Sequence, residues 1–389
     1  MKILIGLTYY RPHISGVTVY AERLAKAFVA RGHEVTILTS RYRQDLPRDE
    51  QADGIHIIRI PVLCRISKGV IMPGLGVEAT RQIRKADVVQ LHLPQFDAAG
   101  MALRGRLFKK PTVLTYHCDL DMPAGILSRS ANAVVNLVND IAARFANGIV
   151  TYTQDYAEHS AFLSRYLNKV NIIQPPVDLP RAVPAEIKRF HEKYNPENRS
   201  PVIGMAARFA SEKGVEVLVN ALPAILQIFP NAVVHYARPL VKEMGEEKYF
   251  KTWIPIINKY EREGHWEFFD GLTPEKMAAY YPNIDVFLVP SLNSTESFGL
   301  VQIEAMMNGV PVIASDLPGV RQPVETFGMG KVVPIGDSPA LANAVIEIIK
   351  NKKAFIQPTD PIRRKFKSEI VAKEYESLFT SISDQMKNA

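Results

Sequence analysis

The chain contains little cysteine and no long apolar run, and both absences narrow its class. Its 389 residues include only two cysteines, Cys64 and Cys118. Two cysteines cannot form a disulfide framework, and no Cys/His cluster has metal-ligand spacing. No stretch approaches the ~20 uncharged apolar residues that a membrane span needs. We therefore expect a protein of a reducing, cytosolic compartment that carries no structural metal.

Low-complexity segments, short repeats and coiled-coil heptads are also missing. Hydrophobic residues make up 47% of the chain and charged residues 22%, which is typical of a globular protein and not of a disordered one. The length is sufficient for two domains of ordinary size. The apolar opening, Met1 to Leu7, is soon followed by Arg11, Pro12 and His13, so it predicts a first strand and not a signal peptide.

An acidic surplus is absent from both halves of the chain. The net charge is +7, and residues 1–180 hold 22 Lys+Arg against 15 Asp+Glu. The whole surplus therefore lies in the first half, which favours a basic face for an anionic lipid or an acidic acceptor. The alternative is that these side chains only solubilise this half. No recognition motif for nucleic acid is present.

The basic stretch Ala98 to Lys110 contains Arg104, Arg106 and Lys109 among apolar residues. It predicts a short amphipathic helix that can lie on an anionic membrane surface. A merely solvated helix face is the alternative. We thus expect a cytoplasmic protein with possible peripheral contact at the inner membrane surface.

Short apolar strands alternate with helical stretches, which predicts parallel α/β architecture. The expected strands are 2–7, 34–39, 55–60, 88–91, 112–115, 149–152 and 171–173, then 202–206, 232–236, 266–269, 286–289 and 312–314, and residues 332–334 can end the series. The proline-rich segment 174–180 between the two series predicts a linker. We expect two Rossmann-like, doubly wound domains, 1–176 and 177–369, which bind ligands at the strand ends within an interdomain cleft.

The most informative segment runs from Thr295 to Ala305, between two predicted strands. Its helix is expected to carry Phe298, Gly299 and Leu300 in the first turn. N–H groups in a first turn have no partner within the helix, and the helix dipole favours an anion there. Glycine at 299 would let a ligand approach the backbone closely.

Two glutamates frame this helix with seven residues between them. Glu296 precedes the helix and can reach whatever its N-terminus holds. Glu304 falls on an otherwise apolar face, between Ile303 and Met307, and a carboxylate there is costly unless it is hydrogen-bonded. Glu304 is therefore either a satisfied core residue or an acceptor for ligand hydroxyls.

Other polar side chains follow predicted strands in both halves. Arg208 and Lys213 come after the strand 202–206 and can converge on one point, which suits a diphosphate. Alternatively, Arg208 pairs with a local carboxylate and Lys213 is solvated. Gly16 lies in the first β–α turn, where small residues allow a phosphate to approach. His117 and Arg238 each end a strand, and either can be structural; Arg238 can reach a base or phosphates or form a salt bridge.

These segments resemble, in order along the whole chain, the retaining glycosyltransferases of family 4, which have the GT-B fold. Glu296 to Glu304 resembles their Glu-x7-Glu signature, and Arg208 to Gly214 their Arg-x4-Lys-Gly phosphate-binding element. The segment with Gly271 and Leu272 resembles the one whose backbone holds the nucleotide base. Ser15 and Arg238 stand where glycine is usual. Asp119-Leu120-Asp121 spells the Asp-x-Asp motif of a different fold, which we interpret as coincidence, although either carboxylate can touch the acceptor.

The resemblance implies a metal-independent, retaining transfer of a hexose from a UDP-sugar or GDP-mannose to a hydroxyl of a glycan, lipid-linked or small-molecule acceptor. It assigns catalytic roles to His117, Arg208, Lys213 and Glu296. Donor binding falls to Gly16, Arg238, Gly271, Leu272, Ser297, Phe298, Gly299, Leu300 and Glu304. The last helix is expected over roughly residues 362–386, and the C-terminal helical part, about 370–389, is expected to return to the first domain. Alternatives are a nucleotide-sugar epimerase, a phosphorylase or a non-catalytic scaffold.

Overall fold

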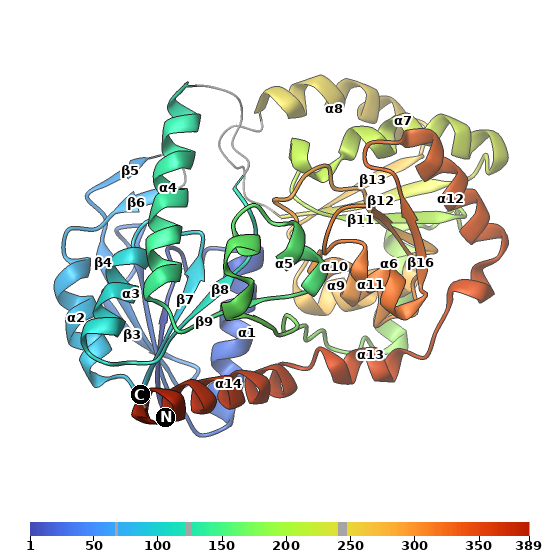
Figure 1. Cartoon of the computed structure of the whole chain (residues 1–389). Helices are drawn as coiled ribbons and strands as arrows, with labels where there is room; N and C mark the ends of the chain where they lie inside the picture. Colours follow the sequence, from blue (N-terminus) through green and yellow to red (C-terminus); the bar gives the residue numbers. More distant parts are fainter. Residues whose placement is uncertain (67–68, 121–125, 240–246, 389) are drawn as a thin grey trace. The chain divides into compact units, whose positions relative to one another are not determined.

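The computed structural model describes residues 1–66, 69–120, 126–239 and 247–388. The chain divides into two compact units (Figure 1). One unit combines Met1–Pro176 with the segment from Phe366 onward, and the other is Val177–Lys365. Residues 366–369, which we assigned to the second domain, thus lie in the first unit.

The expected single helix over residues 362–386 is wrong, because the chain forms two helices there. Helix α13, Thr359–Lys365, ends in the second unit, and α14, Ser368–Asn388, begins in the first. Phe366 lies between them and is only 1% exposed. The N–H groups of Ile370 and Val371 both donate to the carbonyl of Lys367, which starts the second helix anew.

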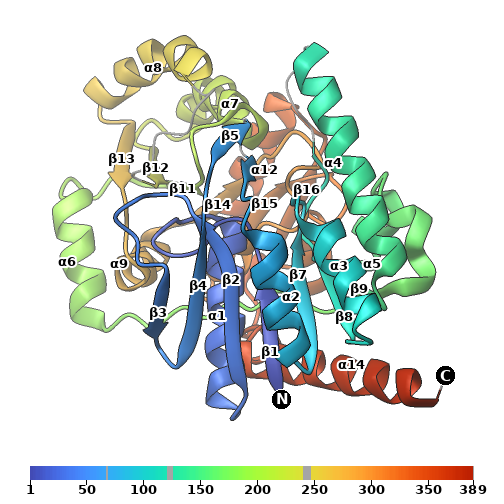
Figure 2. The same ribbon diagram turned by 90° about the vertical axis from the view of Figure 1, so that its left-hand side faces the viewer.

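The first unit is built on an eight-stranded sheet of order β10-β9-β8-β7-β1-β2-β4-β3 (Figure 2). Its strands are β1 (Lys2–Gly6), β2 (Glu34–Arg41), β3 (Asp49–Ala52), β4 (Ile55–Pro61), β7 (Val88–Leu93), β8 (Thr112–Tyr116), β9 (Gly148–Thr151) and β10 (Val170–Ile172). All pair in parallel except the edge strand β3, which is antiparallel to β4. The sequence analysis missed β3, which is polar, and the separate β5–β6 hairpin (Cys64–Ile66, Gly69–Ile71), whose strands are only 3 residues long.

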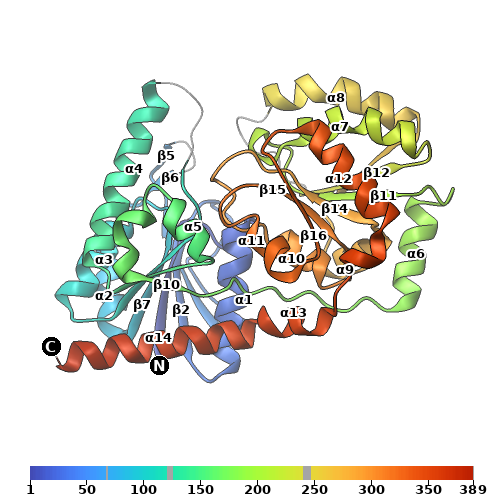
Figure 3. The ribbon, with the colours of Figure 1, turned by 45° about the vertical axis from the view of Figure 1, so that its right-hand side comes forward.

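Helices cover both faces of this sheet. They are α1 (Gly16–Ala30), α2 (Leu75–Lys85), α3 (Ala98–Leu107), α4 (Ile126–Phe145), α5 (Gln154–His159) and α14. Leu91 and Leu114 face the core formed with α2, α3 and α4. Because strand side chains alternate, Gln90 and His92 face the opposite side, where α1 packs against α14 (Figure 3).

The second unit holds a fully parallel six-stranded sheet of order β13-β12-β11-β14-β15-β16. Its strands are β11 (Val202–Ala206), β12 (Val233–Arg238), β13 (Trp266–Asp270), β14 (Val286–Val289), β15 (Val312–Ser315) and β16 (Gly330–Val333). Taken along the chain, this is the 3-2-1-4-5-6 Rossmann order, whose ligands bind where the order reverses, at the carboxyl ends of the first and fourth strands. Those two strands are β11 and β14.

The helices of the second unit are α6 (Pro184–Tyr194), α7 (Val215–Ile228), α8 (Glu247–Arg262), α9 (Pro274–Tyr280), α10 (Leu300–Met306), α11 (Gln322–Phe327), α12 (Ser338–Lys350) and α13. Two Rossmann-like sheets confirm the predicted doubly wound α/β class. Among the described residues, no helix is both long and apolar enough to cross a bilayer.

Candidate functional site

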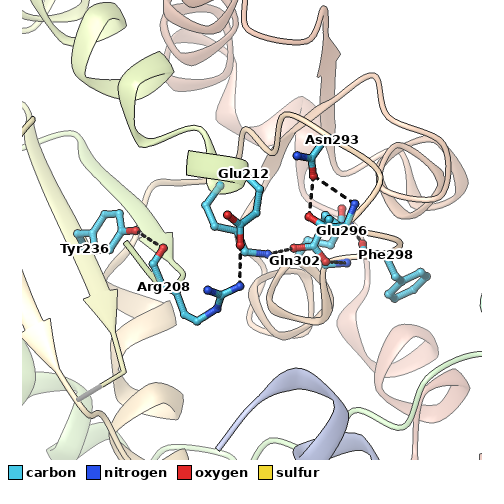
Figure 4. A network of polar contacts seen from close by, with 10 residues as sticks. Arg208, Glu212, Tyr236, Asn293, Glu296, Phe298 and Gln302 are labelled. Atoms are coloured by element: carbon cyan, nitrogen blue, oxygen red, sulfur yellow. Dashed lines mark hydrogen bonds and ion pairs between the residues drawn. The ribbon is translucent and has the colours of Figure 1, made fainter. Parts of the chain in front are cut away.

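Arg208 follows β11, and both its guanidinium and its backbone carbonyl are hydrogen-bonded (Figure 4). Its Nη2 lies 2.6 Å from Oε1 of Glu212, and its carbonyl accepts a hydrogen bond of 3.1 Å from the hydroxyl of Tyr236. Burial acts to raise the pKa of the Glu212 carboxyl, but Arg208, a backbone hydrogen bond and Lys213 together hold that pKa below its usual value. The Glu212 carboxylate therefore stays charged and fixes the guanidinium.

Lys213 reaches across from the β11 side to the loop after β14. Its Nζ lies 2.7 Å from Oε2 of Glu296, and the other oxygen of Glu296 accepts 3.0 Å from the N–H of Gly299. The two side chains are only 17% and 20% exposed. Of the sequence alternatives, Arg208 does pair with a local carboxylate, that of Glu212, whereas Lys213 is bound to Glu296 and is not merely solvated.

Gly214 allows the segment after β11 to approach the loop after β14 closely. Its φ is +67°, and a Cβ there would lie 2.0 Å from the carbonyl oxygen of Pro290, which directly follows β14. Only glycine adopts this left-handed backbone and contact without strain. The segment after β11 therefore packs closely against the end of β14, where the strand order of the sheet reverses.

Helix α10 begins at Leu300, two residues later than the expected first turn of Phe298, Gly299 and Leu300. Gly299 is its N-cap with a φ of +75°, and Ser297 and Phe298 are buried in the preceding loop. The buried amide of Gln302 donates to the Phe298 carbonyl and, at 3.0 Å, to the Val320 carbonyl. This loop is thus fixed from within, and its Gly299 N–H is already bonded to Glu296.

Glu304 is 9% exposed and lies on α10 as expected. The hydroxyl of Tyr281, which is fully buried, donates to its Oε2 at 3.0 Å. The carboxylate is therefore partly satisfied within the protein, and a ligand hydroxyl would have to share it.

Arg238, the last residue of β12, is paired with Asp270, the last residue of β13. Its guanidinium also stacks 4.1 Å from the ring centroid of Phe268. The Arg238 carbonyl accepts a 2.8 Å hydrogen bond from the N–H of Gly271, which precedes Leu272. Of the two alternatives for Arg238, the structure shows the salt bridge. The segment with Gly271 and Leu272, which was expected to hold the nucleotide base, lies directly beside Arg238.

Gly16 is the first residue of α1, and Ser15 is its N-cap. The Ser15 hydroxyl accepts from the Thr18 N–H at 3.3 Å, while the Thr18 hydroxyl accepts from the Ser15 N–H at 2.7 Å. Serine in place of the usual glycine thus forms a capping box. None of the described atoms lies within 4 Å of a Cβ built on Gly16, so the space beside it is open.

His117 lies directly after β8 and is 6% exposed. Its Nε2 is 2.8 Å from Nδ1 of His92, and its Nδ1 is hydrogen-bonded to the hydroxyl of Tyr152. Burial, and secondarily His92, lowers the pKa of His117 well below its usual value. The imidazole is therefore neutral, and both ring nitrogens have protein partners.

Asp119 is also engaged locally. Its Oδ1 accepts from the hydroxyls of Tyr116, at 2.8 Å, and Ser160, at 2.7 Å. Asp121 lies outside the described residues. In the described parts of the chain, no group of three or more His, Cys, Asp or Glu side chains is arranged to hold a metal ion.

Several residues that contact the predicted site residues were missed by the sequence analysis, among them Glu212, His92 and Tyr152. Glu212 was visible as the residue before Lys213, and an i,i+4 Arg–Glu spacing predicts a local pair. His92 and His117 each stand at the carboxyl end of an apolar strand. Their contact follows only when β7 and β8 are known to be neighbours, which is a property of the sheet order.

Comparison with known sequences gives matches that together span most of the chain. Residues 14–181 match the profile described as Glycosyltransferase Family 4. Residues 186–367 match the profile described as Glycosyl transferases group 1. The chain is 25% identical to a phosphatidyl-myo-inositol mannosyltransferase of Mycobacterium leprae, covering 94% of each protein. It is 27% identical to a GDP-mannose-dependent alpha-mannosyltransferase of Mycolicibacterium smegmatis, covering 91% of this chain and 90% of that protein.

Solved structures agree on the fold. Anabaena Alr3699/HepE, determined in complex with UDP, superposes with a TM-score of 0.77 at 19% identity, covering 98% of this chain and all of that one. Sucrose-phosphate synthase from Thermosynechococcus elongatus gives a TM-score of 0.75 at 20% identity, covering 98% of each chain. At such identities the likeness concerns the fold alone.

Proposed function

The chain belongs to the family 4 glycosyltransferases, and on that premise we propose that it transfers a hexose from a nucleotide diphosphate sugar to an acceptor hydroxyl, with retention and without a metal. The observation that carries the proposal is the cluster of Arg208, Lys213, Glu296 and the Gly299 N–H where the second sheet reverses its strand order. Two cations and a backbone donor at that place suit a diphosphate.

Cleavage of the sugar–phosphate bond develops negative charge on the leaving diphosphate. In our proposal Arg208 and Lys213 stabilise that charge. Electrostatic stabilisation of this kind is often the largest contribution to an enzyme's rate enhancement. Both cations are paired with carboxylates in the protein. The donor phosphates must therefore share Arg208 with Glu212 and Lys213 with Glu296, or displace those carboxylates. Glu296 then becomes available to accept from the sugar hydroxyls.

We assign the remaining predicted residues to binding. Glu304 is proposed to accept from the ribose hydroxyls, and the backbone at Gly271 and Leu272 to hold the base. His117 is proposed to contact the transferred sugar. A donor phosphate oxygen is proposed to take the acceptor's proton, with attack on the face from which the diphosphate departs. Isolation of a covalent glycosyl-enzyme on Glu296 would contradict this scheme.

The relatives suggest which substrates to try first. One relative is named as GDP-mannose-dependent and another as acting on phosphatidyl-myo-inositol, while the structural neighbour from Anabaena was solved with UDP. We accordingly propose GDP-mannose or a UDP-sugar as donor, and a lipid-linked or small-molecule acceptor.

A thermal-shift panel of UDP, GDP, ADP and CDP with their common sugars, run in excess chelator, tests the donor site. A ligand at 100 times its Kd stabilises the folded state by about 2.7 kcal/mol. We expect one nucleotide to raise the melting temperature without metal. No shift with any of them would remove the donor site and favour a non-catalytic scaffold. Consumption of the donor without an acceptor would instead favour an epimerase or a phosphorylase.

Substitution of the two cations tests their role in turnover. We expect Arg208→Ala and Lys213→Ala each to lower kcat by about 10²–10³-fold, the range seen when one oxyanion-stabilising donor is removed. Lys331→Ala is the matched control, because Lys331 forms an ion pair with Glu347 in the same unit at a more exposed position. Wild-type rates in both Arg208→Ala and Lys213→Ala would show that these residues are structural.

We also propose peripheral contact with anionic membrane through α3. Leu107 is 67% exposed and Leu103 38%, and Arg106 and Lys109 are exposed beside them. Arg104 is not counted, since it bonds Thr80 and the Gly100 carbonyl. Apolar side chains flanked by cations suit an anionic interface.

Co-sedimentation with phosphatidylglycerol vesicles tests this contact, with phosphatidylcholine vesicles as the neutral comparison. Leu107→Glu combined with Lys109→Glu is expected to abolish binding to the anionic vesicles. Lys188→Glu, an exposed charge reversal in the second unit, is expected to preserve it. Equal binding to both lipids, or equal binding by all variants, would exclude the surface.

A further inference from the structure

Three rings from three neighbouring strands form one hydrogen-bonded row in the first unit. His92 is on β7, His117 follows β8, and Tyr152 follows β9, in the order in which these strands lie in the sheet. His117 is the middle member, bonded to His92 through Nε2 and to Tyr152 through Nδ1. Its own backbone N–H continues the sheet by donating to the Leu93 carbonyl at 3.0 Å.

His92 is almost completely buried, and its ring packs against two other rings. It is 2% exposed, and its ring is stacked on that of His117, with centroids 5.0 Å apart and planes at 16°. Tyr20 of α1 lies edge-on against both imidazoles, at 5.7 Å and 5.1 Å. None of the described residues bonds His92 Nε2. Within the described parts of the chain, the one hydrogen bond of the His92 ring is thus to His117.

A neutral imidazole carries one N–H, so the His92–His117 contact has two possible proton arrangements. In the first, His92 Nδ1–H donates to His117 Nε2, and His117 Nδ1–H donates to the Tyr152 oxygen. In the second, every donor is reversed, and His92 Nε2–H becomes a buried donor without a partner. Buried donors without partners are rarer in proteins than acceptors in that state. At His92 the first arrangement therefore costs less, because it leaves the unpartnered Nε2 as an acceptor.

We propose that His92 is a positioning residue that fixes the ring plane of His117 and holds it in the Nδ1–H tautomer. The inference rests on the proposed function, in which His117 contacts the transferred sugar. The second hydrogen bond of a histidine sets which ring nitrogen carries the proton. A misplacement of about 1 Å in a site can cost about 10²-fold in rate. His92 therefore acts on the reaction without touching the substrate.

The substitutions His92→Asn and His92→Leu separate positioning from packing. Asparagine places an amide N–H near the position of Nδ1 and can still donate to His117, whereas leucine fills the space without a donor. We expect His92→Leu to lower kcat about 10–100-fold, with less change in the KM for the donor. His92→Asn is expected to recover most of the lost kcat.

NMR of ¹⁵N-histidine-labelled protein reports the tautomer independently of turnover. We expect His117 to be the Nδ1–H form in the wild type and in His92→Asn, and to lose that preference in His92→Leu. His235→Leu is the matched control, because His235 is also a buried histidine but lies in β12 of the other unit. It should leave the His117 signals unchanged.

Three results would overturn the proposal: an Nε2–H tautomer in the wild type, a wild-type tautomer in His92→Leu, or a wild-type kcat in His92→Leu. If no donor is turned over by the wild type, the proposed function fails instead. The NMR comparison would then still decide whether His92 sets the state of His117. If His92→Leu does not fold, the wild-type and His92→Asn spectra carry the test.

Discussion

At the scale of single residues, the two cations predicted to bind the diphosphate each form an ion pair within the second unit. Arg208 and Lys213 are held by Glu212 and Glu296 rather than left open. These side chains are half-buried, and removing one partner of such a pair destabilises the protein because the remaining charge is then only partly compensated. Charge-removing variants of the acidic partners must therefore be interpreted through the cations that they hold.

Gly214 offers a prediction about backbone strain. Alanine at this position would keep a φ of +67° and bring its Cβ within 2.0 Å of the Pro290 carbonyl oxygen. A non-glycine residue in this conformation costs about 1–3 kcal/mol, and the overlap adds to that cost. We expect Gly214→Ala to lower the free energy of unfolding of the second unit by at least this amount, measured by urea denaturation. An unchanged midpoint would mean that the two loops can separate freely.

Gly16 should behave in the opposite way. Its Cβ would meet none of the described atoms within 4 Å, and the residue begins a helix. Gly16→Ala is therefore expected to preserve the melting temperature. If the donor passes close to this backbone, the same variant will raise the KM for the donor several-fold. An unchanged KM would remove Gly16 from the predicted donor site.

At the scale of elements, α14 is joined to the first unit by a buried polar contact. The Tyr375 hydroxyl lies 2.7 Å from that of Tyr20 on α1 and 2.9 Å from Thr115 Oγ1 on β8. Gln90 of β7 extends the chain by donating to Thr115 at 3.0 Å. The last helix thus fixes the same strands that carry His92 and His117.

Tyr375→Phe tests this attachment. The variant keeps the ring but leaves the buried hydroxyl of Tyr20 without this partner, which costs about 1–3 kcal/mol. We expect hydrogen exchange of the amides of α1 and α14 to become faster by the corresponding factor. Amides of the second unit serve as the internal control and should not change. Faster exchange in both units would indicate a general loss of stability instead.

The helices and strands also show which parts of the fold could be predicted from the sequence and which could not. The apolar runs predicted the parallel strands of both sheets, since fully buried strands are apolar on both faces. Strand β3, Asp49–Ala52, has no such run and is fixed by pairing with β4. The break at Phe366 was invisible because helical periodicity continues on both sides of it. The partner of Arg208 was left open, as it depends on side-chain positions within one turn.

At the scale of the whole molecule, three buried neutral histidines link stability to pH. Burial lowers the pKa of His92 to about 3 and of His235 to about 4, and lowers that of His117 well below its usual value. Below pH ~6.5 the unfolded chain binds protons at these positions and the folded chain does not. Stability is therefore lost as the pH falls from about 6.5, by up to about 1.4 kcal/mol per pH unit for each histidine.

We accordingly expect the melting temperature to fall steadily between pH 6.5 and pH 4.5 and to be insensitive to these histidines above pH 7. His235→Leu should make the decline of the second unit less steep, since it removes one of the groups that must be kept neutral. Differential scanning calorimetry across this range checks the prediction. An identical slope in His235→Leu would show that its folded pKa is close to the unfolded value.

The return of α14 to the first unit has a consequence for synthesis on the ribosome. Domains generally fold in the order in which they are made, amino-terminal first. Here Val177–Lys365 is a continuous stretch, whereas the first unit needs residues from Phe366 onward. The second unit is therefore complete in the nascent chain before the first. Until the segment from Phe366 onward has been synthesised, α14 does not cover the face of the first sheet that carries Thr115 and Gln90, and that face is accessible to molecular chaperones.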